Sequence, residues 1–292
     1  MRARKCKISL FLSLLIVFIN YYRYPSFSYN AATSTLIIQC MSSPVHESVV
    51  SLFNKRIHAA QLKLPRDVER SIRTQTGRDY RGFEDRWEGS KKMPNLAIQV
   101  KNAAGNLEVK WVLEIGFSET YNDLVDDIKL WLEGRSEVST VILIKIKETP
   151  RYKCPISLDD DLNQLGIPLT EVDVLSSDVI CTGEYGPATY RGKTWVGQIS
   201  EVIMEVWKRD TNGLAKKSKE KNLLDDTHHS IQFQLIEFLN QRIIVNLKEF
   251  RDCFKDDIKE LAVDRCRTLI KEYKKRMGEG LDDPDYQPGL EI

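Results

Sequence analysis

The chain has 292 residues, of which 42% are hydrophobic and 29% are charged, so it is long enough to bury one full core and to carry appendages. Its net charge is +1, but residues 1–40 hold five Lys/Arg and no acid, which leaves 38 basic against 42 acidic residues, or −4, for the remainder. This balance excludes a globally basic nucleic-acid-binding protein, so any contact with nucleic acid would use a local patch.

Six cysteines are scattered without C-x-x-C pairs or histidines at zinc-binding spacing. This usage is typical of buried or free thiols in a reducing compartment, and it predicts an intracellular protein of the cytoplasm or nucleus. The cysteines are Cys6, Cys40, Cys154, Cys181, Cys253 and Cys266.

The N-terminus points the other way, because four basic residues precede an apolar run over residues 8–19. This layout is typical of a signal peptide or a short signal anchor, although a membrane span needs about 20 apolar residues. The alternative is that the folded protein begins at Met41 and that residues 1–40 are a signal-like or dispensable extension. A secretory or membrane-anchored location through residues 8–19 therefore stays open.

The first core helix is expected over residues 44–60, where apolar residues recur at helical spacing behind two serines that can cap the helix. Residues 66–86 are rich in arginine and predict either a solvated loop or helix face or a phosphate-contacting patch. Residues 95–101 alternate as a strand, and a turn at 104–106 joins this strand to a second one over 108–117 as a hairpin.

Within that second strand, residues 110–117 place the carboxylate of Glu114 among apolar neighbours. A buried charge needs a metal, a cation or strong hydrogen-bond donors nearby. Ser118 or Thr120 then caps a helix that runs to about residue 132, and residues 138–147 form another buried strand. A strand–helix–strand unit of this length predicts a right-handed crossover with parallel strands.

The motif E-x-G-x-S-E-[ST]-Y at residues 114–121, followed by D-x-x-x-W-L on the helix, resembles uncharacterised fungal proteins of the restriction-endonuclease-like, or PD-(D/E)XK, nuclease superfamily. The resemblance covers roughly residues 90–207. It implies an α/β fold with a core of one helix, a β-meander, a second helix and a further strand, the mixed sheet being flanked by helices. It also implies a divalent metal held by an Asp on the second strand and a Glu on the third.

Carried over residue by residue, the resemblance makes Glu114 the metal-binding carboxylate and puts Pro94-Asn95 where the family has Pro-Asp. Glu114 and Asn95 would hold Mg²⁺, which would polarise a phosphodiester and activate a water. The family's lysine, two residues after the Glu, is replaced by Gly116. Lys110 is the first substitute, on the same strand face as Glu114. The other substitutes are Lys101, Lys145 and Lys147.

The alternative is a fold kept without catalysis. Glu114 would then cap the helix that follows or pair with a lysine, and Asn95 would finish a turn. The histidines at positions 46, 58, 228 and 229 suggest no catalytic pair.

The rest of the chain predicts a Pro- and Asp-rich irregular segment over 150–177, with a turn at 159–161, a short strand at 172–175 or 179–181, and a turn at 183–187. A helix is expected over 195–207. The predicted organisation is a nuclease-like domain over 41–208, a linker over 209–227, a helical extension over 228–277 and a disordered tail over 278–292.

Two functions follow as hypotheses. The first is a metal-dependent nuclease with a degenerate site, using Mg²⁺. The second is a catalytically inactive nuclease-like module that binds nucleic acid, or binds a protein through its C-terminal helices.

Overall fold

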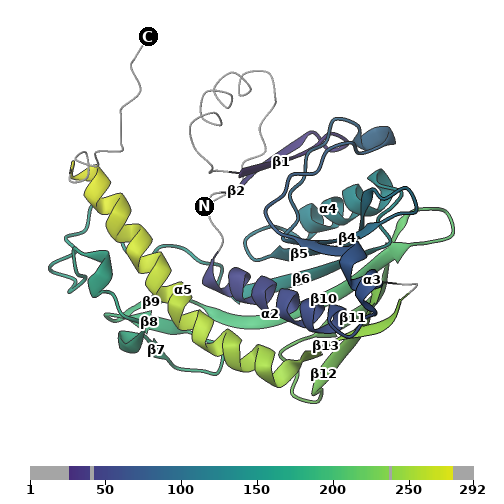
Figure 1. Cartoon of the computed structure of the whole chain (residues 1–292). Helices are drawn as coiled ribbons and strands as arrows, with labels where there is room; N and C mark the ends of the chain where they lie inside the picture. Colours follow the sequence, from purple (N-terminus) through teal and green to yellow (C-terminus); the bar gives the residue numbers. More distant parts are fainter. Residues whose placement is uncertain (1–25, 40–42, 237–238, 279–292) are drawn as a thin grey trace, which may run out of the picture. The chain divides into compact units, whose positions relative to one another are not determined.

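The computed structural model describes residues 26–39, 43–236 and 239–278 (Figure 1). These residues divide into two compact units. One, here called the sheet unit, comprises residues 26–39, 46–147 and 201–252, and the second unit comprises residues 43–45, 148–200 and the described residues from 253 onward. Helix α5 contributes residues to both.

The elements of the first half of the chain are β1 (Ser26–Asn30), β2 (Thr35–Gln39), α2 (Pro44–Gln61), α3 (Arg66–Ser71), β3 (Ile72–Gln75), β4 (Leu96–Lys101), β5 (Leu107–Gly116), α4 (Tyr121–Gly134) and β6 (Thr140–Thr149). The second half contains β7 (Ile180–Cys181), β8 (Ala188–Tyr190), β9 (Lys193–Val196), β10 (Gln198–Arg209), β11 (Ala215–Asn222), β12 (Ser230–Ile236), β13 (Leu239–Asn246) and α5 (Leu247–Arg276).

A mixed six-stranded sheet with the order β11-β10-β6-β5-β4-β3 forms the centre of the sheet unit. Strands β3, β4 and β5 make an antiparallel meander, while β5 and β6 are parallel and are joined by α4. The prediction that the strands near residues 110–117 and 138–147 are adjacent and central is confirmed, as is their parallel pairing. The fold is therefore α/β.

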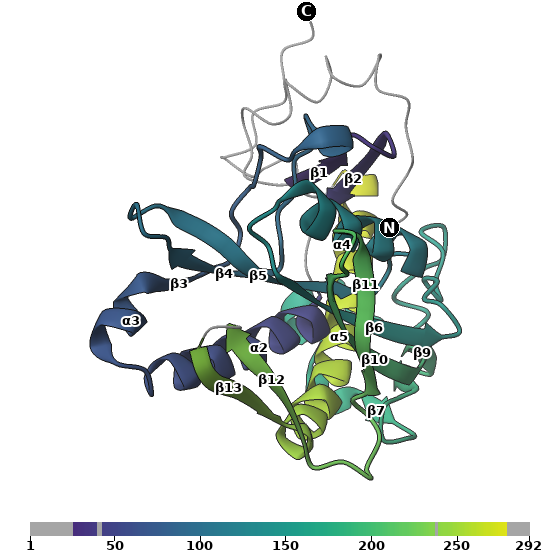
Figure 2. The same cartoon turned by 90° about the vertical axis from the view of Figure 1, so that its right-hand side faces the viewer.

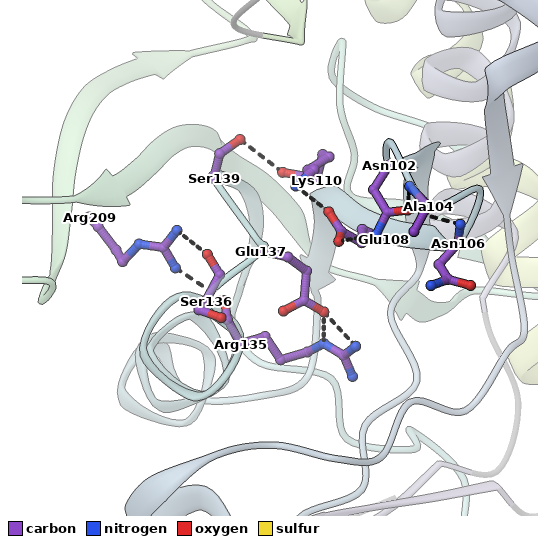
Figure 3. Close-up of polar contacts among 10 residues, drawn as sticks. All are labelled: Asn102, Ala104, Asn106, Glu108, Lys110, Arg135, Ser136, Glu137, Ser139 and Arg209. Carbon is purple, nitrogen blue, oxygen red and sulfur yellow. Dashed lines mark hydrogen bonds and ion pairs between the residues drawn. The ribbon is translucent and has the colours of Figure 1, made fainter.

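Helices cover both faces of this sheet, with α4 on one side and α2 on the other (Figure 2). Of the two predicted N-cap candidates, Ser118 and Thr120, Thr120 caps α4. Its hydroxyl accepts a hydrogen bond from the Asp123 N–H at 3.2 Å. At the other end, the Arg209 guanidinium donates to the carbonyls of Arg135 and Ser136 (Figure 3). It also donates to the carbonyl of Leu132. Cationic donors suit the negative end of the helix dipole, so β10 fixes where α4 ends.

On the α2 side, the ring of Phe233 from the β12–β13 hairpin stacks between Phe53 of α2 and Trp111 of β5, with centroid distances of 6.0 Å to each. The prediction of helices throughout residues 230–277 is therefore wrong for its first half. The sequence alternates polar and apolar residues over 230–235, and β13 buries Ile243 and Val245 while Ile244 between them is exposed. Among the described residues from 230 onward, the helical part is α5.

The predicted helix over residues 195–207 is also wrong, because these residues belong to β9 and β10. Apolar residues here satisfy a helical spacing, but Ile199, Val202, Ile203 and Val206 are β-branched and favour strands. Pairing beside β6 then decides the conformation. The predicted linker at 209–227 likewise contains β11, which pairs with β10 at the edge of the sheet.

Residues 26–39, predicted to lie outside the fold, instead form the β1–β2 hairpin. Tyr29 exchanges backbone hydrogen bonds with Lys91 at 2.7 and 2.8 Å, and the Ala31 N–H donates to Ser90 Oγ at 2.9 Å. The apolar run at 8–19 lies outside the described residues. In the described parts of the chain, no helix is long and apolar enough to cross a membrane.

The second unit holds the antiparallel β7-β8-β9 sheet and the irregular segment that precedes it. Arg265 binds both carboxylate oxygens of Glu148, at 2.7 and 2.8 Å, and the Trp195 carbonyl at 2.8 Å. Asp160 and Asp161 accept backbone N–H bonds from Ser157 and Asn163, so this acidic run forms turns, as predicted.

Gly116 gives the first testable prediction. A Cβ there would lie 2.8 Å from Cδ2 of the buried Leu124 and closer still to its Cδ1, so Gly116→Ala should lower the free energy of unfolding by about 1–3 kcal/mol. Urea unfolding measures the change. In a Leu124→Ala background the cost should shrink, since the clashing carbons are gone. An equal cost in both backgrounds would contradict this packing.

Candidate functional site

Glu114 lies on β5 and turns its side chain toward α4. Its Oε1 accepts a hydrogen bond from the Trp131 indole N–H at 2.6 Å, and its Oε2 lies 3.8 Å from the Lys92 ammonium. The residue is only 3% exposed. The expectation that this carboxylate is buried is therefore met, and its partners are a cation and a strong donor supplied by the protein.

Lys92 is held between two carboxylates. Its Nζ lies 2.5 Å from Oδ2 of Asp127, and it is 3% exposed. Its backbone is fixed by a reciprocal pair of hydrogen bonds with Tyr80, at 2.8 and 3.0 Å. Asp127 and Trp131 are four residues apart on α4, so both face the sheet from neighbouring turns. We call Lys92, Glu114, Asp127 and Trp131 the buried charge cluster.

Aromatic side chains cover this cluster. Trp131 makes edge-to-face contacts with Tyr80 and Phe83, at centroid distances of 5.5 and 5.4 Å, and all three rings are buried in one core with Trp87. The Tyr80 hydroxyl finds no hydrogen-bond partner among the described residues. Because the surroundings are apolar, each charge in the cluster depends on its protein partners rather than on solvent.

The cluster carries one cation and two carboxylates. Burial raises the pKa of Glu114 to about 7, and the Asp127 charge adds to this effect, whereas Lys92 and the Trp131 hydrogen bond oppose it. Burial alone would lower the pKa of Lys92, but the charges of Asp127 and Glu114 outweigh it and raise that pKa. Burial also raises the pKa of Asp127, although the Lys92 charge opposes this effect. Lys92 is therefore a firmly held cation, and burial favours the protonated form of both carboxyl groups.

Asn95 does not join Glu114. Its Oδ1 accepts from the Ile115 backbone N–H at 2.6 Å, and its amide nitrogen lies 2.7 Å from Nε2 of His46 on α2. Glu114 instead contacts α4, on the other face of the sheet (Figure 2). The two predicted metal ligands thus point toward different helices.

Lys110 is engaged at the far end of β5. Its ammonium donates to Glu108 at 2.7 Å, and Glu108 also accepts from Asn102 (Figure 3). Four residues of strand, or about 13 Å, separate the Cα atoms of Lys110 and Glu114. The structure therefore does not bring Lys110 to the predicted site.

The other substitute lysines are placed elsewhere as well. Lys145 donates to the carbonyls of Phe117 and Glu119 at 3.2 and 2.6 Å, Lys147 lies 3.4 Å from Glu201, and Lys101 is exposed at the end of β4. At Gly116, where the resemblance expects a lysine, a Cβ would clash with the side chain of Leu124.

Sequence reasoning missed Lys92, Asp127 and His46. Asp127 carried a usable signal, because it falls three residues after Leu124 and four before Trp131, inside the apolar stripe of the predicted helix. Lys92 and His46 carried no such signal in the sequence, because their partners, Asp127 and Asn95, lie tens of residues away in the chain.

These residues do not fit Mg²⁺ as they are arranged. Both oxygens of Glu114 face protein donors or a cation, and the only Asn95 oxygen already accepts a backbone hydrogen bond. Mg²⁺ requires free carboxylate or carbonyl oxygens around an octahedron. In the described ranges, no group of three His, Cys, Asp or Glu side chains could hold a metal ion.

Comparison with known proteins adds no relative. No family model matches the chain, and a search of curated proteins gives no match.

The raised pKa of Glu114 predicts how stability depends on pH. The folded chain retains a Glu114 proton that the unfolded chain releases between about pH 4.5 and 7, so the free energy of unfolding should fall as pH rises through this window. Glu114→Gln should remove a decrease on the order of 1–3 kcal/mol, because Gln carries no charge and can still accept from Trp131. Urea unfolding at pH 5 and pH 7.5 measures the difference.

Asp126→Asn provides the control, since Asp126 lies beside Asp127 in sequence but is part-exposed and pairs only loosely with Lys129 at 3.9 Å. It should leave the slope unchanged. If Glu114→Gln keeps the wild-type slope, Glu114 does not titrate in this window.

Proposed function

We propose that this chain is a restriction-endonuclease-like module that uses Glu114 for structure and acts by binding rather than by phosphodiester hydrolysis. Two features support the fold assignment: the order α2, β3-β4-β5 meander, α4, β6, and the parallel β5–β6 pair. Glu114 lies on β5, the third strand of this meander, and Asn95 directly precedes β4, the second strand, where the resemblance expects an acid on the strand itself.

One observation carries the proposal: the Glu114 carboxylate is sealed against Lys92 and Trp131. A nuclease metal would have to displace a buried ammonium that Asp127 also holds at 2.5 Å. It would then leave that ammonium close to a divalent cation in an apolar core. The repulsion between an ammonium and a neighbouring divalent cation costs several kcal/mol in a low-dielectric interior.

The same residues make a Mg²⁺-dependent endonuclease the weaker hypothesis. Its other parts are also missing from the vicinity of Glu114, because Asn95 faces His46 and Lys110 is bound to Glu108. The partner is then a nucleic acid or a protein, and of the predicted C-terminal helices only α5 is available for a protein. We place the protein in the cytoplasm or nucleus, which the free thiols of Cys154, Cys181, Cys253 and Cys266 support.

Metal titration tests this proposal. The wild-type chain should show no binding heat with Mg²⁺ or Mn²⁺ at about millimolar concentration, and it should not cleave labelled DNA or RNA. Asn95→Asp should change neither result, because the new carboxylate would lie beside Ile115 N and His46 rather than beside Glu114.

The control is Glu108→Gln, which removes a carboxylate from the same strand at the end far from Glu114. Metal-dependent cleavage that is lost in Glu114→Gln but kept in Glu108→Gln would establish the nuclease hypothesis instead. Tighter Mg²⁺ binding by Asn95→Asp would point the same way.

A further inference from the structure

The β10–β11 ribbon carries an unusual concentration of charge. Residues 208–222 contain six Lys/Arg and two acidic residues, in a chain that is nearly neutral overall. Two of the basic residues serve the fold: Arg209 caps α4, and Lys217 binds the buried Glu205 at 3.0 Å. The four remaining lysines are Lys208, Lys216, Lys219 and Lys221.

A β-bulge sorts these four lysines onto one face. Register across the ribbon pairs Met204 with Lys221 and Val206 with Lys219, and it pairs Lys208 with Lys216. Residues directly opposite each other share a face.

Between these pairs the register shifts at Val206/Trp207, and the extra residue, Ser218, donates its hydroxyl to the Val206 carbonyl at 2.9 Å. Without this shift, Lys216 would face away from Lys219 and Lys221. We call Lys208, Lys216, Lys219 and Lys221 the lysine stripe.

On β10 the stripe face also packs, since Met204 and Val206 are buried, so the stripe lies mainly along the edge strand β11. The other face of the ribbon packs under α4. Ala215 packs against the core under α4, Trp207 is buried in that core, and Lys217 reaches Glu205 there. Neither acidic residue of the segment lies on the stripe face of β11. Glu220 stands opposite Glu205 in the register and so lies on the other face, and Asp210 accepts hydrogen bonds from the backbone N–H groups of Asn212 and Leu214 in the turn. The charged residues that β11 places on the stripe face are therefore all lysines.

The stripe is available to a partner. Lys216 and Lys219 are exposed and Lys221 is half-buried, and none of the three lies within ion-pair distance of a carboxylate in the described part of the chain.

We propose that the lysine stripe binds the phosphate backbone of a nucleic acid. This inference rests on the proposed function, because it supplies the partner of the binding module. Alternate positions on a strand repeat every 6–7 Å or so, which gives a linear row of cations suited to a linear polyanion. A two-stranded ribbon is also one of the elements that a DNA major groove admits.

A lipid surface fits less well. Membrane-bound surfaces combine cations with apolar side chains that insert, and on this ribbon Leu214 in the turn, 53% exposed, is the one large apolar residue more than half exposed. Sequence-independent phosphate contacts predict weak binding with a dissociation constant of about 10⁻⁴–10⁻⁶ M and a steep dependence on salt.

The test is fluorescence anisotropy with a labelled 20-nucleotide single strand and the matching duplex. The triple variant Lys216→Ser, Lys219→Ser and Lys221→Ser should bind at least about tenfold more weakly. Its log–log salt slope should fall by about 2.7 on duplex or about 2.1 on single strand, since each lost phosphate contact removes about 0.9 or 0.7.

The control variant is Lys63→Ser, Lys101→Ser and Lys248→Ser, which removes three exposed lysines of the sheet unit and the same total charge. It should keep its affinity within about threefold and its salt slope. Replacing the three stripe lysines by Arg should retain binding, and this charge-preserving variant keeps the test valid if the serine variant unfolds.

Equal losses in the stripe and control variants, or no loss in either, would overturn the inference. So would stripe-dependent binding to vesicles containing phosphatidylserine without binding to either oligonucleotide. If the serine variant self-associates by light scattering while its oligonucleotide affinity is unchanged, the lysines protect a sheet edge and the inference also fails. Cleavage of the bound oligonucleotide with Mg²⁺ would refute the proposed function alone.

Discussion

The cost of burying Glu114 constrains the whole sheet unit. A carboxylate on a central strand must have partners, and here they come from Lys92, which is brought in by its backbone pairing with Tyr80, and from Trp131 on α4. Asp127 holds the lysine from the same helix. The cluster therefore links the segment before β4, strand β5 and helix α4, and it fixes how that helix lies on the sheet.

This arrangement is the basis on which we propose a binding function for the α/β fold. The Lys92 ammonium lies beside the Glu114 carboxylate, where a metal would have to bind, and Gly116 lets Leu124 pack closely against β5. The surface that we propose for a partner is the lysine stripe at the edge of the sheet. There the bulge at Ser218 separates the lysines that serve the fold from those that face outward.

Sequence patterns predicted the helices whose two faces differ in polarity, α2 and α4, and the strands that are mostly apolar, β4, β5 and β6. They failed where one pattern fitted both helical and strand spacing, as in residues 195–207 and 230–246. They also failed for β11, because its almost entirely polar and charged sequence is typical of a linker. The need of Glu114 for a partner was predictable from burial, but the identity of Lys92 was not, because it depends on the pairing of residues 80 and 92.

The central claim is that Lys92, rather than a metal, neutralises Glu114. A double-mutant cycle of Lys92→Met and Glu114→Gln, followed by urea unfolding with and without about 10 mM Mg²⁺, tests it most directly. Lys92→Met alone should cost about 3–5 kcal/mol, since it strands buried carboxylates, and adding Glu114→Gln should recover at least about 1 kcal/mol, with no effect of Mg²⁺. Additive losses, together with Mg²⁺ stabilising the wild type but not Glu114→Gln, would contradict it.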